Sequence, residues 1–390
     1  MLAAIAWRNL WRNKLRSAVI ITAIAIGIIG TVVTDGFMSG MTDQRVNAAI
    51  ANEVSNIQIH NPAFLLNEEI KYTIPQAQKT GNTIRKNQDV KAVSLRLKCQ
   101  AMASSAIAGA GVTVYGIRPD DEKQVSALHE HIIKGNYLSG KQRFSAIIGQ
   151  KLAKKLDLGM DDKVIVTLAD TTGTITSGAF QIVGIFKTSN DMFDESHVFI
   201  LKSDMAKLMG FSSASSNEIA ILLNNNHSTR SVVRELNKTF KKEIAAHQIV
   251  IQSWDQILPI LKSLVEIMDY FSYLFLLIIL VALAFAIINT MLMAVMERTR
   301  EIGILMALGL SKRKIFSLIV LETVFLSITG ALVGILISIS IVYHYSIYGF
   351  DLSFVAGGLN SIGYSSTIFF RVSNNFYLAT AIMVILIAVL

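Results

Sequence analysis

A dense group of charged side chains lies in a short polar stretch between two long apolar segments. Its members are Glu297, Arg298, Arg300 and Glu301, followed by Lys312, Arg313 and Lys314. Carboxylates and guanidinium groups crowded in this way suit charge-assisted hydrogen bonds to a partner, which are roughly twice as strong as neutral ones. We interpret the stretch as a short amphipathic helix that lies along the bilayer and presents a charged face to the solution.

Signatures of catalysis or of cofactor binding do not stand out in the sequence. There is no glycine-rich phosphate loop, so we expect ATP hydrolysis to lie outside this chain. The seven histidines are scattered, and His129 and His131 form the closest pair. Their spacing would suit two metal ligands on one side of a strand, but we favour a solvated turn as the explanation. We expect no metal and no cofactor bound by this chain, and a solvated loop for the acidic run Asp120–Glu122.

One carboxylate falls inside an apolar segment. Glu322 lies about seven residues, or roughly 10 Å, into the apolar run that follows the charged stretch. A carboxylate at that depth is costly unless it is paired or reached by water. We expect a structural or coupling role for Glu322, in preference to proton transport.

The composition and the placement of charge indicate a membrane protein. Apolar residues make up 52% of the chain and charged residues 16%, with a net charge of +8. Among the short segments that flank the apolar runs, basic residues gather in an N-terminal arm (Arg8, Arg12, Lys14, Arg16) and in the charged stretch. By the positive-inside rule both segments are cytoplasmic, which places residues 42–269 outside and argues against nucleic acid as the partner of the basic groups.

Hydropathy divides the chain into eight segments. We predict a cytoplasmic amphipathic helix at 1–16, spans at 17–41, 270–295 and 315–345, an extracytoplasmic domain at 42–269, a cytoplasmic link at 296–314, an extracytoplasmic loop at 346–376, and the start of a fourth span at 377–390. The last run is too short to cross a bilayer, so we expect the chain to be cut inside that span. Gly330 and Gly334 form a GxxxG pair suited to close helix contact.

Local signals shape the link and the domain. In the link, Ile302, Leu305, Met306 and Leu308 recur at helical spacing, Gly309 suits a left-handed helix end, and Ser311 suits the next helix cap. Residues 42–269 mix strands with helices, which predicts an α+β domain with a smaller strand-rich insertion at about 128–210. Predicted strands are 54–60, 93–98, 112–117, 146–149, 164–168, 180–186 and 249–252, and predicted helices are 75–88, 151–156, 229–246 and one from residue 255 into the second span.

The link also carries a family resemblance. It contains the string ERTREIGILMALGLSKRKI, with Glu322 soon after it, and so resembles the signature of MacB/FtsX/LolC-type ABC transporter permeases. The resemblance implies that the link is the coupling helix that docks on cytosolic ABC ATPase subunits, which bind ATP and Mg. It assigns this docking to Glu297, Arg298, Arg300, Glu301, Ile302 and Gly303. The implied fold is a membrane α-helical permease of four spans with an α+β extracytoplasmic domain between spans 1 and 2.

Looser similarities favour one branch of the family. The domain contains VYGIRPDDEKQVSAL and AFQIVGIFKTSNDMFDESHVFI, which are similar to stretches of the lipoprotein-releasing, LolC/LolE-type permeases. They imply a bacterial inner-membrane protein that transmits ATP-driven motion to a periplasmic domain and releases lipoproteins, with a second permease as homo- or heterodimer partner and a periplasmic carrier as a further candidate. No proline lies in 167–181, where a carrier-binding hook is expected, so carrier docking on this chain stays open.

Two other functions fit the same family signature. One is efflux of peptides or drugs with an outer-membrane partner, and the other is FtsX-like signalling to a cell-wall hydrolase. For the lipoprotein function we predict a cavity open to the outer leaflet, framed by the outer ends of spans 1 and 2. Its tentative lining is Val33, Phe37, Met38, Met41, Met268, Phe271 and Leu274. Ordinary contact with membrane lipids or packing between spans would explain the same residues.

Overall fold

The computed structural model describes residues 6–8, 12 and 14–389. Much of the predicted N-terminal amphipathic helix, residues 1–16, therefore lies outside the described residues. The chain divides into two compact units. We call them the helical unit (residues 1–44, 263–353 and 367–390) and the sheet unit (residues 45–262 and 354–366). Part of the predicted loop 346–376 thus belongs to the sheet unit.

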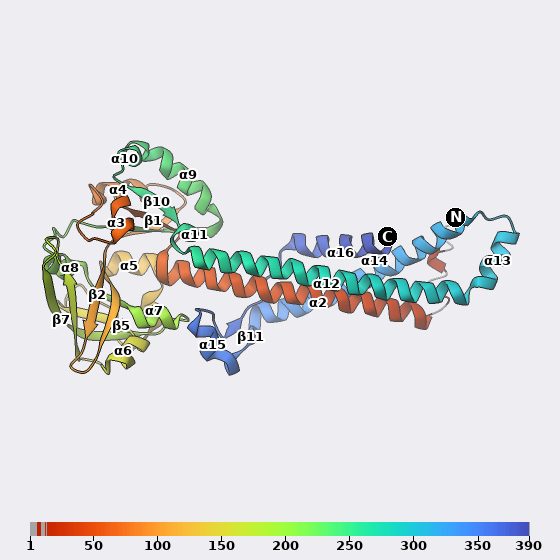
Figure 1. Ribbon diagram of the computed structural model, residues 1–390, viewed down its shortest axis with the longest axis horizontal. Coiled ribbons are helices and arrows are strands. Elements are labelled where there is room, and N and C mark those ends of the chain that lie inside the picture. The colour runs from red at the N-terminus through yellow and green to blue at the C-terminus, as the bar shows by residue number, and fades with distance from the viewer. Residues whose placement is uncertain (1–5, 9–11, 13, 390) are drawn as a thin grey trace. The chain divides into compact units, whose positions relative to one another are not determined.

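Long apolar helices make up the helical unit (Figure 1). They are α2 (Lys14–Ala48), α12 (Pro259–Glu297), α14 (Lys312–Tyr348) and the shorter α16 (Asn374–Val389), with α13 (Thr299–Ala307) between α12 and α14. Within the described residues, three helices have the length and apolar composition to cross a membrane, at 17–54, 259–297 and 312–348. Each extends beyond the corresponding predicted span, because the helix continues where the hydropathy falls.

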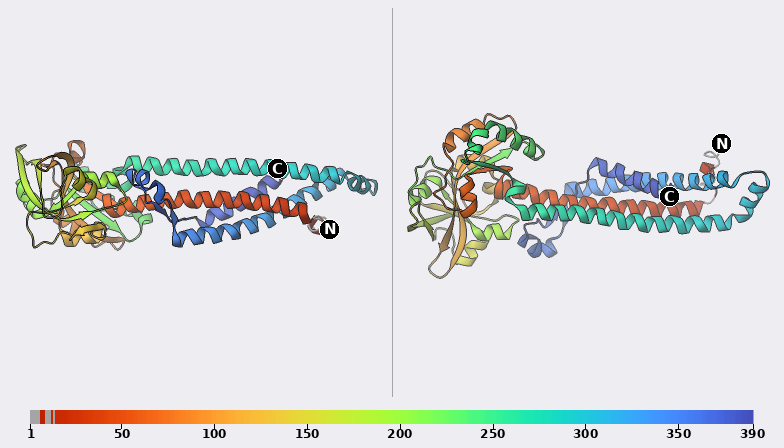
Figure 2. Two further views of the ribbon diagram at one scale, coloured as in Figure 1. Left: turned by 90° about the horizontal axis from the view of Figure 1, so that it is seen from below. Right: turned by 45° about the horizontal axis from the view of Figure 1, so that its top comes forward.

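Small residues set the packing of these helices. A Cβ added to Gly330 would lie 2.8 Å from Cβ of Ile24, and one on Gly334 would lie 3.0 Å from Cα of Ala25. Both distances are too short for any larger side chain, so the predicted GxxxG pair brings α14 against the backbone of α2. On another side of α2, Gly27 faces Leu283 of α12. α16 lies alongside α14 (Figure 2).

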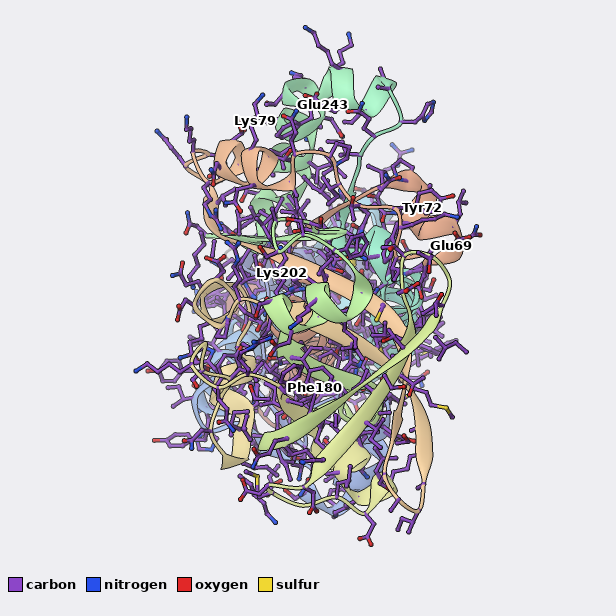
Figure 3. All side chains as sticks on the ribbon, turned by 90° about the vertical axis from the view of Figure 1, so that its left-hand side faces the viewer. Glu69, Tyr72, Lys79, Phe180, Lys202 and Glu243 are labelled. Carbon is purple, nitrogen blue, oxygen red and sulfur yellow. The ribbon has the colours of Figure 1, made fainter. Side chains whose placement is uncertain are left out.

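The sheet unit has two lobes joined by one long strand, β2 (Val90–Ser104). In the first lobe, the strand order is β10 (Val250–Ser253), β1 (Ile57–His60), β9 (Glu218–Leu223) and the first half of β2. Helices α4 (Ala77–Ile84) and α9 (Thr229–Thr239) cover one face, because Ile84 and Leu236 pack on Ile59 and Leu95 in a single apolar core. In Figure 3, Lys79 of α4 and Glu243 of α10 (Lys241–Ala245) mark this lobe.

The second lobe is a closed ring of six strands. From residue 97 onward β2 pairs with β3 (Gly109–Ile117), and the ring continues through β8 (His197–Leu201), β5 (Ser145–Gly149), β7 (Ile175–Phe186) and β6 (Lys163–Ala169), which pairs back to β2. β4 (Ile132–Gly135) extends β7 on its free side. Apolar side chains such as Val114, Ile148 and Phe180 (labelled in Figure 3) form the core of this lobe. Apolar side chains of the helices α6 (Gln150–Leu156) and α8 (Lys202–Met209) pack against the same core.

Most predicted strands are confirmed as parts of these strands, and four boundaries were wrong. The strand predicted from residue 54 begins at Ile57, because residues 49–54 form the π-helix η1 (Ala49–Val54). The helix predicted at 75–88 shortens to α4, and the helix at 229–246 breaks at Phe240 between α9 and α10. The helix from residue 255 is interrupted at Leu258, since Pro259 disfavours helical geometry in the residue before it. β4, β8 and β9 were not predicted.

The strand-rich lobe also starts earlier than the predicted insertion at 128–210. β2 and β3 precede residue 128 yet supply two strands of the ring. Sequence alone could not show this, because β2 belongs to both lobes. The predicted α+β class is confirmed.

A buried charge cluster joins the first lobe to α5 (Pro119–Val125). Arg96 of β2 donates to Glu122 through Nε and Nη2 (2.9 and 2.6 Å) and to Glu218 of β9 through Nη1 (2.8 Å). Burial by itself would raise the pKa of Glu218, but Arg96, His60 and Lys98 outweigh it and hold that pKa below its usual range. The acidic run predicted as a solvated loop is therefore a helix whose Glu122 is fully buried.

Replacing Glu122 by Gln is expected to lower the free energy of unfolding by about 3 kcal/mol, because removal of one partner leaves buried positive charge poorly compensated. Urea unfolding of the detergent-solubilised full chain measures this loss. Asp120→Asn is the matched control, since Asp120 is exposed on the same helix. Equal stability of the two variants would contradict the role given to Glu122.

Candidate functional site

The predicted coupling segment folds as a helix between two helix ends. α12 ends at Glu297, Arg298 leaves the helical conformation, and α13 runs over Thr299–Ala307. Gly309 has φ +93°, as its predicted left-handed position requires, and Ser311 is the N-cap residue of α14. The link is thus held at both ends by backbone geometry that the sequence encodes locally.

The inner side of α13 closes over a small cavity of about 50 Å³. Ile302 and Leu305 face Ile315, Leu318 and Ile319 of α14 across this cavity. These contacts attach the coupling segment to the start of the third long helix. Any displacement of α13 must therefore move α14 or break an apolar contact.

An ion pair reinforces the same contact. Nη1 of Arg298 lies 3.2 Å from both carboxylate oxygens of Glu322, and the two side chains are only 14% and 13% exposed. This pairing explains how a carboxylate is tolerated in an apolar helix, since an unpaired charge there would be strongly unfavourable. Nε of Arg298 is buried and has no hydrogen-bond partner among the described residues, so the guanidinium contacts Glu322 through Nη1, while Glu301 interacts with it electrostatically.

A second ion pair lies on the exposed side. Nη2 of Arg12 donates to both oxygens of Glu301, at 2.8 and 2.6 Å. The hydrogen bond from Arg12 holds the pKa of Glu301 below its usual value. Both side chains are about half exposed, so water screens this pair and it can exchange partners at little cost.

The outward surface of α13 combines charge with exposed apolar side chains. Glu297 and Arg300 are exposed, and so are Ile304 (56%) and Leu308 (75%). Around Gly303 a Cβ would meet no atom within 4 Å. The expectation that Ile302, Leu305, Met306 and Leu308 share one side was wrong, because Ile302 and Leu305 face inward while Met306 and Leu308 are exposed. A solvent-facing surface of this composition is typical of a docking site.

The residues tentatively assigned to a substrate cavity occupy different surroundings in one chain. Phe37 packs inside the helical unit against Phe350 and Phe370, with ring centroids 6.2 and 5.8 Å apart. Val33 and Met41 also pack against that core, and Met38 and Met268 are half-buried. Phe271 (46%) and Leu274 (49%) are exposed on α12. The packing alternative therefore accounts for Phe37, and only Phe271 and Leu274 present open apolar surface.

The histidine pair considered as metal ligands lies in a short 3-10 helix, η2 (Leu128–His131). Nδ1 of His129 lies 3.2 Å from the Ser126 carbonyl oxygen. Among the described residues, no three His, Cys, Asp or Glu side chains are grouped as a metal site would require.

Two pairings at this site were not predicted from sequence, namely Arg12 with Glu301 and Arg298 with Glu322. Arg298 was assigned to docking instead, and it points inward. The sequence did indicate that Glu322 has a partner, because a carboxylate within an apolar helix needs a cation nearby. Which of Arg298 and Arg300 supplies it depends on the turn between α12 and α13.

Comparison with known proteins gives two adjoining matches. Residues 17–239, more than half of the chain, match the family described as the MacB-like periplasmic core domain, and residues 273–390 match the FtsX-like permease C-terminal family. The matched regions correspond to α2 with most of the sheet unit, and to the later helices with α13.

Individual relatives are distant. An uncharacterized ABC transporter permease of Methanocaldococcus jannaschii is 26% identical over 53% of this chain and 50% of its own length. The macrolide export ATP-binding/permease protein MacB of Neisseria gonorrhoeae is 28% identical over 46% of this chain and 28% of its own length. The lipoprotein-releasing system transmembrane protein LolC of Buchnera aphidicola is 24% identical over 87% of this chain and 83% of its own length.

The first two of these relatives are thus matched over half of their length or less. Among solved structures, the periplasmic region of MacB from Actinobacillus actinomycetemcomitans is similar, with 12% identity, a TM-score of 0.39, and coverage of 55% of this chain and 96% of that one.

Replacing Glu322 by Leu is expected to release α13, because the largely buried Arg298 loses its hydrogen-bonded ionic partner, at a cost of about 3 kcal/mol or more. Hydrogen exchange of residues 299–307 in the nanodisc-embedded chain should accelerate, and the charge exchange Arg298→Glu with Glu322→Arg should slow it again. Glu301→Gln serves as the control, since its screened pair with Arg12 contributes less than about 1 kcal/mol. Unchanged exchange in Glu322→Leu would show that the apolar contacts alone hold the helix.

Proposed function

Because this chain belongs to the family of ABC transporter permeases with a MacB-like periplasmic core and an FtsX-like C-terminal region, we propose that it couples ATP hydrolysis in a separate cytosolic subunit to lipoprotein release. The chain is a multi-pass protein of the bacterial inner membrane with a periplasmic domain, which is the sheet unit. It contributes the membrane part of the transporter, and the cytosolic subunits bind ATP and Mg.

The observation that carries the coupling role is the two-sided character of α13. Its inner side is tied to α14 by Ile302, Leu305 and the Arg298–Glu322 pair, while Ile304 and Leu308 face outward. An ATPase docked on the outward side would pull on α14 through the inner side. Glu297, Arg300 and Glu301 would guide docking by charge, and the open surface at Gly303 would let a partner backbone approach closely.

The transport cycle then follows from rigid connections. ATP binding brings two ATPase subunits together, the two attached α13 helices move with them, and the long helices pass this motion to the sheet unit. A second permease, identical or related, completes the dimer. Within the described spans few charged side chains are available to line a path for a polar solute, which favours a mechanical lever over a channel.

Lipoprotein is the substrate class we favour. Support comes from the stretches in the sheet unit that resemble lipoprotein-releasing permeases, and from a LolC relative that aligns over most of both chains. Phe271 and Leu274 offer apolar surface on α12 that could contact acyl chains. Efflux with an outer-membrane partner is the second candidate, favoured by the match to a macrolide-exporting relative.

The coupling prediction concerns Ile304. Ile304→Asp should leave the protein inserted and folded but reduce export and co-purification of the ATPase by about tenfold, the effect of roughly 1.4 kcal/mol lost from an apolar contact. Met306→Asp is the matched control, because Met306 is also an exposed apolar residue of α13 but lies about 200° around the helix from Ile304. If both variants lost export and ATPase binding equally, the effect would come from any added charge on α13 and not from a docking face that contains Ile304.

The substrate prediction uses a photo-crosslinking amino acid at Phe271. Without ATP it should capture acylated protein, and ATP with the ATPase should abolish the capture, since closure of the dimer would expel the acyl chains. The same probe at Leu336, an exposed apolar residue of α14, should capture only phospholipid. Capture of a peptide or drug would favour efflux, a hydrolase at the sheet unit would favour signalling, and ATP-insensitive phospholipid alone would exclude a substrate site at Phe271.

A further inference from the structure

The first long helix does not end at a cap. α2 ends at Ala48 and continues directly as the π-helix η1 (Ala49–Val54), and Ser55 follows with φ +65°. Such helices are rare and occur mostly at functional sites. Oδ1 of Asn52 and Oγ of Ser55 are buried and have no hydrogen-bond partner among the described residues. Unsatisfied polar atoms and an unusual backbone are both unfavourable, so the surroundings must hold this segment in place.

A buried polar cluster supplies that restraint. Nη1 of Arg45 lies 3.0 Å from Oε1 of Glu53, and these side chains are only 9% and 12% exposed. Arg45 lies on α2 just before the π-helix and Glu53 lies near the end of the π-helix, so their ion pair ties the last turn of α2 to η1. The same Oε1 accepts a hydrogen bond of 2.9 Å from Nδ2 of Asn190.

Asn190 is itself rigidly placed. It is the N-cap residue of α7 (Asp191–Ser196), where its Oδ1 accepts from the backbone N–H groups of Met192 and Phe193. Its backbone N–H donates to Oγ1 of Thr188. The Asn190 side chain therefore caps α7 of the second lobe with its amide oxygen and donates to Glu53 with its amide nitrogen.

Arg45 also contacts the connection that follows the third long helix. Gly363, just after α15 (Ala356–Ser361), has φ +82°, and a Cβ there would lie 2.6 Å from Nε of Arg45. The neighbouring Tyr364 is buried. Arg45 is thus enclosed by the π-helical turn on one side and by residues 363–364 on another. A single arginine contacts both connections that enter the sheet unit from α2 and α14.

We propose that Arg45, Glu53 and Asn190 form a latch that keeps η1 in π-helical geometry, so that movement of α2 reaches β1 without being absorbed in the intervening turn. These are positioning residues for transport, and their role rests on the proposed function. A π-helical turn holds one residue more than an α-helical turn. Its collapse to α geometry would change by about 100° the direction in which the chain leaves the helix. Without the Arg45–Glu53–Asn190 contacts, movement of α2 would change the backbone geometry of η1 and would not reach β1.

Hydrogen exchange of the full chain in nanodiscs tests the latch independently of transport. Glu53→Gln should accelerate exchange over residues 49–55 by roughly ten- to hundredfold, the equivalent of one lost charge-assisted bond. Gly363→Ala should accelerate exchange over the same residues, because the added methyl group would displace Arg45. Gly357→Ala is the control and should leave exchange unchanged, because Gly357 has no positive φ and its added methyl group would meet no atom within 4 Å. Glu235→Gln, exposed on α9, is the control for the glutamate substitution.

Transport measured in proteoliposomes with the co-purified ATPase tests the coupling. Glu53→Gln should retain ATP hydrolysis but lose export of acylated protein at least about fivefold, and the charge exchange Arg45→Glu with Glu53→Arg should recover part of the export. Faster exchange with normal export would reduce the cluster to a structural role and overturn the proposal. Unchanged exchange in Glu53→Gln would overturn the latch itself. If the wild-type complex neither hydrolyses ATP nor exports, the proposed function fails, while the exchange result still decides whether the latch exists.

Discussion

A charged side chain is costly to bury unless another charge or hydrogen bonds compensate for it, and three ion pairs of low exposure join elements of this chain. Arg298 and Glu322 meet where α13 folds back on α14. Arg45 and Glu53 tie the last turn of α2 to η1, and Arg96 meets Glu122 and Glu218 within the first lobe. In each case breaking the pair is far more costly than the pair is stabilising, because the remaining charge stays buried. Such pairs therefore specify one arrangement of the elements they join.

The position of each pair matters more than its strength. Apolar contacts in the helical unit can slide with small losses, because a long helix offers many similar grooves. Arg45 and Arg298 each hydrogen-bond one carboxylate and Arg96 hydrogen-bonds two, so each arginine is tied to particular residues. The Arg298–Glu322 pair thus restrains the turn between α12 and α13, and the Arg45–Glu53 pair restrains η1. The exposed Arg12–Glu301 pair lacks this property, since water can replace either partner.

The sheet unit is suited to respond as a rigid body. β2 belongs to both lobes, so neither lobe can rotate without breaking backbone hydrogen bonds along one continuous strand. The ring of six strands leaves no open edge between β2 and β7, and its interior is filled by apolar side chains. A force delivered at β1 would therefore be shared through β9 and β2 by the whole unit.

The sequence by itself determined the membrane class, the three long apolar helices and the short polar helix between the second and third of them. These features depend on hydropathy, on the placement of basic residues and on local signals such as Gly309 and Ser311, all of which act over a few residues. It also identified Glu322 as a charge that needed compensation. The same local rules predicted most strands, because each strand has its own pattern of apolar residues that can be recognised without knowing its neighbours.

Only the tertiary structure decided which residues compensate one another. Arg298 rather than Arg300 reaches Glu322 because the chain turns between α12 and α13, and Glu122 is buried because α5 packs on β2. The closed ring and the π-helical turn likewise depend on partners distant in sequence. Local propensity describes a single segment, whereas burial of a charge or closure of a sheet depends on two segments meeting, and that meeting is set by the packing of the whole chain.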